Sequence, residues 1–394
     1  MTILRYIVIG LTYIGLGLGY LPGLRMNRAS IALVGASLLM ALGVLDLKAA
    51  WGAIDYKTLI FLFSMMVISA NLAYSGFFQL ALDQIMRHVR SPFGLLIVLT
   101  FGSAILSAFF LNDTIALILT PLTLGLAQAL SLNPIPYLLA LAGATNIGSV
   151  ATLSGNPQNI LIGSFSGISY FDFAKALTPI ALVSLLIQIG LLWLLYPDVR
   201  STKSCLSGDP LHYRVFKPLL TKSLLITVGL LVAFLIGIPP AQATLVAASL
   251  LFIARLKSQR ILNKVDWDLL VMFSGLFIVT DGVEKLGILN LFGSLVHTPL
   301  SILGVTALLS NLVSNVPAVL LLQHLIPHPD QKTWLLLAAG STLAGNLTLL
   351  GSVANLIVAE AVAKLGYQLS FWEHLRFGLP LSVLTLLLTY WWVV

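Results

Sequence analysis

Hydrophobic residues fill most of this 394-residue chain, in long runs that short polar segments separate. Several runs last about 17–25 residues, the length that an α-helix needs to cross a bilayer. Two further apolar stretches, 93–130 and 300–326, carry polar residues near their middle and are predicted to be re-entrant hairpins. The predicted membrane spans are 4–21, 29–45, 57–76, 135–163, 178–196, 223–237, 241–254, 267–284, 334–363 and 376–393.

Composition supports the prediction of a membrane protein. Hydrophobic residues make up 58% of the chain and charged residues only 9%, whereas soluble domains carry about 25% charged residues. We therefore expect an all-α, multi-pass protein of the plasma membrane or bacterial inner membrane, in contact with lipid and without a nucleic-acid partner. The single cysteine, Cys205, excludes an internal disulfide framework.

Basic residues predict the orientation. If both hairpins return to the side from which they start, 15 of the 21 Lys and Arg residues fall on one side of the membrane. The positive-inside bias then places that side in the cytoplasm and both termini outside. The basic segment 200–222 becomes a cytoplasmic linker between two halves, 1–199 and 223–394.

The two halves repeat each other in sequence. Each half holds five predicted spans and one predicted hairpin, so the second copy is inserted upside down. Inverted repeats of this kind are typical of secondary transporters, whose ligand sites lie near the middle of the membrane. The matched segments are "DYKTLIFLF" (from Asp55) with "DWDLLVMFS" (from Asp266), "AILSAFFLNDTIALIL" (from Ala104) with "ALLSNLVSNVPAVLLL" (from Ala307), "TLSGNPQN" (from Thr152) with "TLLGSVAN" (from Thr348), and "SYFDFAKALTP" (from Ser169) with "SFWEHLRFGLP" (from Ser370).

The segment "TLSGNPQN" (152–159) places five hydroxyl or amide side chains inside the predicted span 135–163. Irregular backbone at membrane depth is tolerated only where protein or water covers it, so this segment is predicted to break the span and to line an internal site. The freed N–H groups of such a break attract anions, and its freed carbonyl groups can coordinate cations. "TLLGSVAN" (348–355) offers the same chemistry in the span 334–363. The residues expected to form the two breaks are Ser154, Gly155, Asn156, Pro157, Asn159, Gly351, Ser352 and Asn355.

Each predicted hairpin carries its polar residues at the expected tip. The first is interrupted by "LNDT" (111–114) and the second by "SNVP" (314–317). Two tips and two broken spans are predicted to meet near the bilayer centre. Neutral Ser, Thr and Asn groups there suit an anion that must be bound and released, together with a small cation.

Asp113 lies in the first tip, where an ionisable side chain marks an ion or proton path by default. The alternative is that it caps the second arm of the hairpin. Asp281, Glu284 and Glu360 lie near span ends. Glu284 is expected to pair with Lys285, and a transport role is the alternative for all three acidic residues. The histidines are scattered, with neither a metal-binding spacing nor a phosphate-binding loop, so we expect neither a metal centre nor an enzyme.

With these tips and breaks in view, the chain resembles the ion transporter superfamily over about residues 50–390. That superfamily includes the divalent-anion/sodium symporters, the citrate–metal permeases, the ArsB-type arsenite permeases and the NhaD-type sodium/proton antiporters. The symporters carry Ser-Asn-Thr at each tip. Here the first tip keeps only Asn112 of that order, and the second keeps Ser314 and Asn315 and lacks the Thr. Its Asn-Val-Pro looks more like the arsenite-permease and NhaD branches.

The resemblance implies a role for individual positions. It implies substrate contact for Asn112, Thr114, Thr152, Asn315 and Thr348. It also implies two coupling-ion sites, formed by Ser107, Asn112, Ser310, Ser314, Asn315 and the loops near Gly148 and Asn346. To these residues we add the carboxylate of Asp113 as a candidate for the coupling ion.

We therefore expect a secondary active transporter that moves a small inorganic or organic anion, or an arsenite-like oxyacid, by alternating access. A sodium or proton gradient would drive it without another cofactor, and the resemblance implies a homodimer. The nearest alternative is an NhaD-type sodium/proton antiporter with Asp113 as the exchanging carboxylate, and a channel is a further alternative. The predicted tips contain neither Arg nor Lys, which favours a neutral or monovalent substrate, or a co-bound cation.

Overall fold

The computed structural model describes residues 2–21, 23–86, 89, 91–200, 215–253, 257–291, 295–326, 329–363 and 366–394. Most of the predicted linker 200–222 therefore lies outside the described residues, as does Cys205. The first half contains helices α1 (Thr2–Leu18), α2 (Arg28–Ala41), α3 (Leu47–Ala53), α4 (Tyr56–Ser75), α5 (Phe77–Met86), α6 (Pro92–Phe109), α7 (Asn112–Ala129), α8 (Ile135–Val150), α9 (Pro157–Ser166) and α10 (Tyr170–Leu195), followed by the 3-10 helix η1 (Pro197–Arg200).

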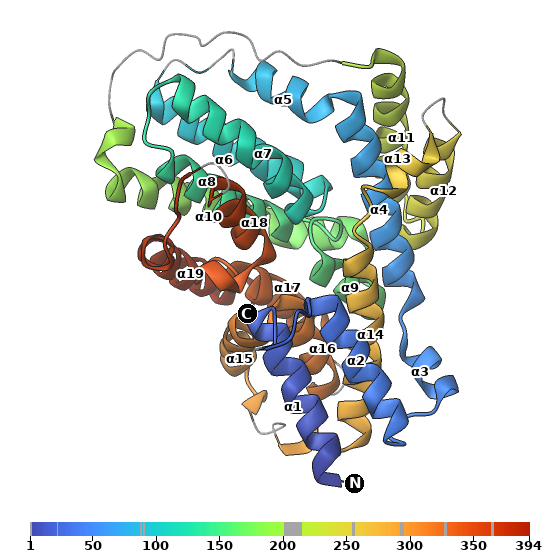
Figure 1. Cartoon of the computed structure of the whole chain (residues 1–394). Helices are drawn as coiled ribbons and strands as arrows, with labels where there is room; N and C mark the ends of the chain where they lie inside the picture. Colours follow the sequence, from blue (N-terminus) through green and yellow to red (C-terminus); the bar gives the residue numbers. More distant parts are fainter. Residues whose placement is uncertain are drawn as a thin grey trace.

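The second half repeats this order (Figure 1). It contains α11 (Lys217–Leu235), α12 (Pro240–Phe252), α13 (Ser258–Leu262), α14 (Trp267–Lys285), η2 (Ile288–Leu291), α15 (Pro299–Val313), α16 (Asn315–Leu325), α17 (Gln331–Ala344), η4 (Leu349–Gly351), α18 (Val353–Ala363) and α19 (Phe371–Val393).

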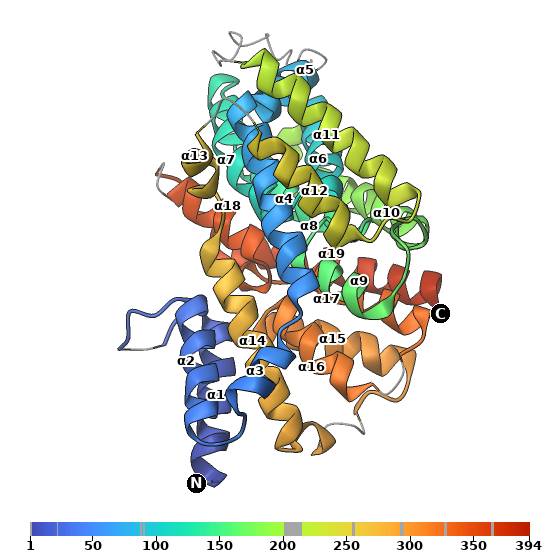
Figure 2. The same ribbon diagram turned by 90° about the vertical axis from the view of Figure 1, so that its right-hand side faces the viewer.

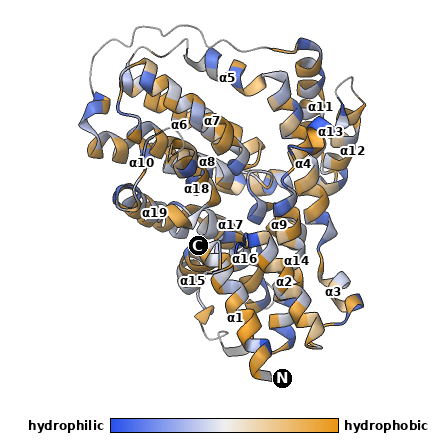
Figure 3. Cartoon of the chain, in the orientation of Figure 1, coloured by the Kyte–Doolittle hydropathy of each residue, from blue (hydrophilic) through white to orange (hydrophobic). Residues whose placement is uncertain are grey.

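The outer surface of the helices is apolar, as a lipid-facing surface must be. Large hydrophobic side chains such as Leu186, Leu225 and Leu387 are more than half exposed. Figure 3 shows the hydrophobic colour along most helices, with hydrophilic residues mainly at helix ends and connections. Within the described residues, five helices are long and apolar enough to cross a membrane by themselves, namely α4, α6, α10, α11 and α19. The protein is thus an integral, multi-pass membrane protein.

In each half, one helix packs along a helix of the other half. Helix α2 lies along α14 of the other half, and α12 lies along α4 in the same way (Figures 1 and 2). The reciprocal packing reveals a further sequence match, because "ASIALVGASLLM" (29–40) aligns with "AQATLVAASLLF" (241–252) without a gap. The first four helices of each half, α1–α4 and α11–α14, therefore pack together as one layer beside the hairpins and broken spans.

The sequence repeats have a local physical cause at helix starts. Asp55 and Asp266 accept hydrogen bonds from backbone N–H groups in the first turns of α4 and α14. Ser169 and Ser370 cap α10 and α19 in the same way. Because these serines begin the helices, α10 and α19 start earlier than the predicted spans, which began at 178 and 376.

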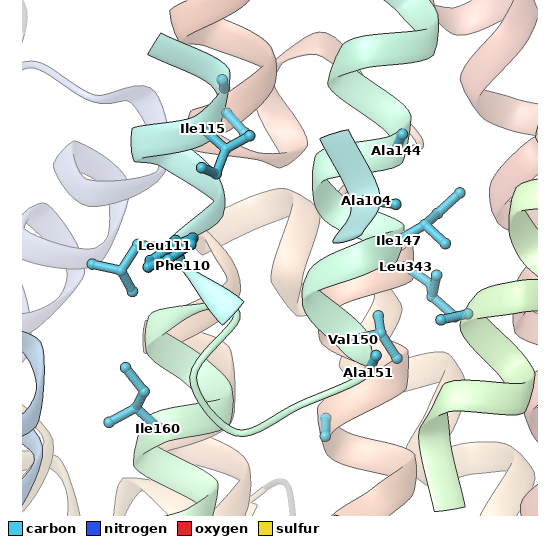
Figure 4. Close-up of a cluster of buried hydrophobic side chains, with 14 of the residues drawn as sticks. Ala104, Phe110, Leu111, Ile115, Ala144, Ile147, Val150, Ala151, Ile160 and Leu343 are labelled. Atoms are coloured by element: carbon cyan, nitrogen blue, oxygen red, sulfur yellow. The ribbon is translucent and has the colours of Figure 1, made fainter. Parts of the chain in front are cut away.

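Both predicted hairpins are present as pairs of helices. Helices α6 and α7 form the first, and the backbone N–H of Asn112 at its tip donates to the carbonyl of Gly155 at 2.9 Å. The interruption falls at 110–111 rather than at 111–114, so Asn112, Asp113 and Thr114 form the first turn of α7. Figure 4 shows Phe110 and Leu111 at this tip, as members of a cluster of buried hydrophobic side chains.

The second hairpin, α15 and α16, has a tighter tip than predicted. Ser314 alone separates the two helices, with φ 81° and ψ 159°. A side chain strongly disfavours this conformation, which is largely confined to glycine. Asn315 and Pro317 already belong to α16, where a proline in the first turn needs no hydrogen-bond partner for its nitrogen.

The two predicted broken spans are also present. Helices α8 and α9 are separated by residues 151–156, and Asn156 caps α9 directly before Pro157. Helices α17 and α18 are separated by residues 345–352, which contain η4. Each break therefore lies between two helices that would otherwise form one span.

Candidate functional site

One asparagine spans each break and satisfies the carbonyl groups that the break frees. The side-chain amide of Asn159 donates to the carbonyls of Ser149 and Thr152, both at 2.9 Å. In the second repeat, Asn355 donates to the carbonyls of Gly345 and Thr348 at 2.9 and 3.1 Å. These four carbonyls occupy matching positions, so the two asparagines hold the same loop shape twice.

The two breaks also bind each other across the pseudo-twofold axis. The amide of Asn156 donates to the hydroxyl of Thr342 in α17 at 3.2 Å. Reciprocally, the hydroxyl of Ser352 donates to the side-chain oxygen of Asn146 in α8 at 2.9 Å. Asn146 and Thr342 are repeat counterparts, and both are almost fully buried. The centre of the protein is therefore a hydrogen-bonded contact between the two broken spans.

Both hairpin tips join this centre. The amide of Asn112 donates to the side-chain oxygen of Asn146 at 3.2 Å, while its own oxygen is buried without a hydrogen-bond partner among the described residues. Asn315 is its counterpart. In the amide orientation that satisfies its neighbours, Asn315 donates to the carbonyl of Ser341 at 3.1 Å and accepts from Gln158 at 3.2 Å.

A cavity of about 640 Å³ lies between this centre and helices α1, α2 and α14. Its floor contains the two tips and both breaks. Its mouth contains the α1–α2 connection and the start of α14, both predicted to be cytoplasmic. The predicted site residues that line it are Asn112, Asp113, Pro157, Ser314, Asn315 and Ser352.

Five charged side chains line the same cavity, namely Arg28, Asp113, Asp266, Asp268 and Glu360. Asp266 is engaged in capping α14, and Asp268 accepts a hydrogen bond of 2.8 Å from the amide of Asn27. Arg28 donates through Nε to the carbonyl of Leu16 at 3.0 Å. The carboxylate of Asp113 has neither a hydrogen bond nor an ion pair within the described part of the chain.

Asp113 does not act as the helix cap that was its alternative role. The cap position of α7 is Leu111, and no side-chain capping bond is present there. A carboxylate in the first turn is still favoured by the helix dipole. Asp113 is thus a half-buried carboxylate at the cavity floor rather than a structural cap.

The predicted substrate threonines lie away from the cavity. The hydroxyl of Thr152 donates to the carbonyl of Ala108, and Ser154 bonds to the hydroxyl of Tyr170 at 2.8 Å. Thr348 donates to the side-chain oxygen of Asn311 at 3.1 Å. Thr114 lies in the first turn of α7 without lining the cavity. The hydroxyls of Thr152, Ser154 and Thr348 hold the loops and tips together.

The predicted coupling-ion residues differ in whether their polar groups already have hydrogen-bond partners within the protein. Ser107 donates to the carbonyl of Thr145 at 2.6 Å, whereas its counterpart Ser310 is fully buried with no hydrogen-bond partner within the described residues. Gly148 lies inside α8 rather than in a loop, and a Cβ there would overlap the backbone of Ala104 in α6. Asn346 lies in the second break, where its side-chain oxygen accepts from Asn146 at 2.8 Å.

Gly155 and Gly351 allow close contacts inside the breaks. A Cβ at Gly155 would overlap the carbonyl of Ser149, and one at Gly351 would come within 2.5 Å of the side-chain oxygen of Asn311. Both glycines therefore occupy positions that have no space for a side chain.

His374 is a buried residue of α19 that contacts the second break and that the sequence did not suggest. Its Nε2 lies 3.0 Å from the carbonyl oxygen of Asn346, to which it can donate. The counterpart position in the first repeat is Phe173, which is also fully buried. The alignment of "SYFDF" with "SFWEH" contained this signal, because it pairs a buried aromatic ring with a histidine.

Arg28, Asn146 and Thr342 are further residues that the sequence did not suggest. Asn146 and Thr342 lie inside regular apolar helices, and only their matching places in the repeat distinguish them. Arg28 belongs to a predicted cytoplasmic end, far along the chain from both tips. It supplies a cation to the cavity that the tips themselves lack.

The predicted pair of Glu284 and Lys285 is wrong. Lys285 pairs with Asp281 at 3.2 Å, one helical turn earlier, and Glu284 faces His324 at 3.4 Å. Spacing explains the difference, because residues four apart on a helix are neighbours while adjacent residues point apart. The described residues contain no cluster of three or more His, Cys, Asp or Glu that could hold a metal ion.

A second cavity of about 380 Å³ lies on the opposite side of the breaks. It is lined by the starts of α4 and α12 and by α9, the counterparts of α14, α2 and α18. Its lining is mostly apolar, and Lys57 is its only charged residue among those described. The matched lining residues of the first and second cavities include Arg28 and Pro240, Ala29 and Ala241, Asp268 and Lys57, Met272 and Phe61, Leu356 and Ile160, and Glu360 and Ser164.

Comparison with known proteins agrees with this architecture. The family model described as Citrate transporter matches residues 18–344. The silicon efflux transporter LSI3 of Oryza sativa subsp. japonica is 32% identical over 91% of this chain and 90% of its own. A putative transporter, arsB, of Dictyostelium discoideum is 26% identical over 93% and 87%. The crystal structure of the Alcanivorax borkumensis YdaH transporter shares the fold, with a TM-score of 0.54 at 16% identity over 92% of this chain and 95% of that one.

Proposed function

The chain belongs to the citrate transporter family of membrane transporters, and from that premise we propose that it is a secondary active carrier that works by alternating access. The cargo is a small anion or an arsenite-like oxyacid. A sodium or proton gradient drives its movement. Hairpins and broken helices carry the site, and the layer of α1, α2, α4, α11, α12 and α14 forms the scaffold and the contact of a homodimer.

One observation carries this proposal, namely that several residues lining the larger cavity have repeat counterparts that line the smaller one. An inverted repeat can exchange the conformations of its halves, and the exchange closes one entrance and opens the other. The larger cavity reaches the tips from the predicted cytoplasmic side. In this proposal the smaller cavity is the outer entrance in its closed form, and a conformation with the larger cavity open is the inward-facing one.

The polar groups of the cavity floor suit a small oxygen-rich cargo. The hydroxyl of Ser314 offers a donor and an acceptor, and the side-chain oxygen of Asn112 is an acceptor without a partner among the described residues. The relatives named for silicon efflux and as arsB are consistent with an oxyacid. Coupling-ion sites at Ser107, Ser310 and the ends of α8 and α17 remain part of the proposal, with oxygen ligands that suit sodium.

A sodium/proton antiporter is the second candidate function. It is favoured by Asp113, a carboxylate that faces the cavity without a bonded partner. In that case Asp113 exchanges a proton for sodium, and no anion is needed.

Uptake into proteoliposomes distinguishes these candidates. Sodium and pH gradients are imposed separately, and accumulation of arsenite, sulfate, phosphate and dicarboxylates is compared with the flux in their absence. Uphill accumulation of one substrate supports the carrier and identifies its coupling ion, whereas cation exchange without a substrate supports the antiporter. Flux that only runs downhill contradicts both.

A matched pair of variants assigns the carboxylate. Asp113→Asn removes the charge at the cavity floor, and we expect it to abolish gradient-driven accumulation. Asp281→Asn makes the same chemical change at an ion pair outside the cavity and serves as the control. Equal activity of the two variants would contradict a role for Asp113.

A further inference from the structure

Arg28 and Asp113 face one cavity from its two sides. Arg28 begins α2, which belongs to the surrounding helices, and Asp113 lies in the first turn of α7 at the hairpin tip. Both side chains are half-buried and both line the cavity. No ion-pair contact joins them, although both line the same cavity. A space therefore separates a guanidinium group from a carboxylate.

Each group retains free hydrogen-bonding capacity toward that space. Arg28 uses Nε for the carbonyl of Leu16, which fixes the direction of the guanidinium and leaves its two outer nitrogens without a bonded partner among the described residues. Asp113 is likewise unbonded within the described residues. A guanidinium offers only donors, and an ionised carboxylate offers only acceptors. The space thus has a donor side and an acceptor side.

We propose that Arg28 and Asp113 together bind a small, uncharged oxyacid between them. The oxygen atoms of the acid accept hydrogen bonds from Arg28, and one of its hydroxyl groups donates to Asp113. The proposal rests on the carrier function above and specifies the charge class of its substrate. Arg28 thereby becomes a specificity-determining residue.

The charge of the cavity favours an uncharged ligand over a dianion. Arg28 is the only basic residue in the described lining, against four carboxylates. Of these, Asp266 and Asp268 are held in other hydrogen bonds, and Glu360 lies at the exposed end of α18. Hydrogen bonds do not remove the charges of Asp266 and Asp268, so one guanidinium faces four carboxylates in the described lining. A dianion would meet net repulsion from these carboxylates, which an uncharged acid avoids.

The pair has no counterpart in the other repeat. Pro240 occupies the position of Arg28, and Val316 occupies that of Asp113. Groups that merely maintained the repeat fold would be expected in both halves, as Asn159 and Asn355 are. The restriction of both charges to one side of one site is therefore evidence for ligand binding rather than for folding.

Equilibrium binding to the purified full chain in lipid nanodiscs tests the proposal. The probes are radiolabelled arsenite, which is the uncharged acid at pH 7, and radiolabelled sulfate. We expect wild type to bind arsenite at least tenfold more tightly than sulfate. Arg28→Gln should weaken arsenite binding at least tenfold, and Arg28→Lys should weaken it less because a donor and the charge remain.

Asp113→Asn gives a result that a structural role would not produce. It should weaken arsenite binding at least tenfold while it strengthens sulfate binding, because the repulsive carboxylate is gone. Arg5→Gln is the matched control. Arg5 also donates to the carbonyl at a helix end, Leu42, but lies outside the cavity, so its loss should change arsenite binding less than twofold.

The outcomes separate this proposal from the carrier proposal. Tighter binding of sulfate than of arsenite by wild type, or binding of neither probe, overturns the assignment. Equal arsenite affinities of the Arg28→Gln and Arg5→Gln proteins overturn it as well. If Arg28→Gln does not fold, the Arg28→Lys and Asp113→Asn proteins carry the same test. Binding as expected without gradient-driven uptake in liposomes would instead contradict the carrier function alone.

Discussion

The two broken spans share their internal hydrogen bonds and differ in their charges. Asn159 and Asn355 donate to carbonyls at matching positions, and Asn156 and Ser352 reach across to matching helices. At the tips the agreement ends, because Asp113 of the first tip faces Val316 of the second in the alignment.

The difference separates residues that build the breaks from residues that act in the site. A group needed to keep backbone polar atoms satisfied at membrane depth is needed twice, once in each repeat. A charged group that acts on the cargo from one side of the site is needed only once, because both repeats meet at one site. By this criterion Asn159 and Asn355, which hold the loops, are structural, and Asp113 and Arg28 are functional.

Replacing Asp113 by valine, the residue at the matching position of the second repeat, should have the largest effect on transport. Asp113→Val copies the second tip, and we expect gradient-driven uptake to fall at least about a hundredfold, equivalent to about 2.7 kcal/mol of transition-state free energy. The thermal unfolding midpoint should stay the same or rise, because a charge within the membrane is removed. Uptake within threefold of wild type would refute the functional role.

The second largest effect is expected where α8 contacts α6, because the two repeats differ in side-chain size at this position. Gly148 lies against the backbone of Ala104, whereas its counterpart Ala344 carries a Cβ in a fully buried position. Gly148→Ala should therefore lower the free energy of unfolding by about 3 kcal/mol through overpacking. Ala344→Gly, the reverse exchange, should cost about 1 kcal/mol through lost helix propensity. Thermal unfolding in detergent measures both, and equal costs would contradict this difference between the repeats.

Asn159 and Asn355 should contribute alike through their bonds to the loop carbonyls, although Asn355 also accepts a hydrogen bond of 3.1 Å from Asn146, and the oxygen of Asn159 has no partner among the described residues. Asn159→Ala and Asn355→Ala each leave two carbonyls without their side-chain donor, so each should lower the free energy of unfolding by about 2 kcal/mol. The comparison is made by thermal unfolding of the two purified variants side by side. A cost at only one of the two positions would show that the hydrogen bonds are not equivalent.

Glycine substitutions at the two hairpin tips should change the stability of the protein in opposite directions. These are the smallest effects that we expect. Ser314 has a positive φ of 81°, so Ser314→Gly should raise the free energy of unfolding by about 1 kcal/mol. Leu111 occupies the first tip with φ −54°, and Leu111→Gly should lower it by about 1 kcal/mol through backbone entropy. If Ser314→Gly destabilises the protein, the hydroxyl of Ser314 contributes more than its backbone conformation costs.

Much of this fold follows from the sequence. Apolar runs, the two polar interruptions and the matched segments predict the spans, the hairpins and both breaks, because backbone at membrane depth allows few other arrangements. The exact ends of the breaks do not follow, since Asn112 and Asn315 fit equally well in a loop or in a first helical turn. The capping serines Ser169 and Ser370 extend α10 and α19 beyond the apolar runs.

The site follows less completely. The tips and breaks were expected to converge, and the cavity does contain Asn112, Asp113, Ser314 and Asn315. Arg28 could not be found this way, because its approach to the tips depends on how α2 packs against α14. Hydroxyls such as that of Thr152 look free in the sequence but are used by carbonyls that only the folded chain brings near.

Side-specific labelling tests the central claim, that the two cavities are alternate entrances to one site. In a Cys205→Ser background, Met272→Cys places a thiol in the first cavity, and Phe61→Cys places one at the counterpart position in the second. A membrane-impermeant maleimide is applied to vesicles of both orientations, with and without a driving gradient. We expect Met272→Cys to react only from the cytoplasm and Phe61→Cys only from outside, with one rate falling as the other rises. Reaction of both from the same side, or rates that rise together, would contradict it.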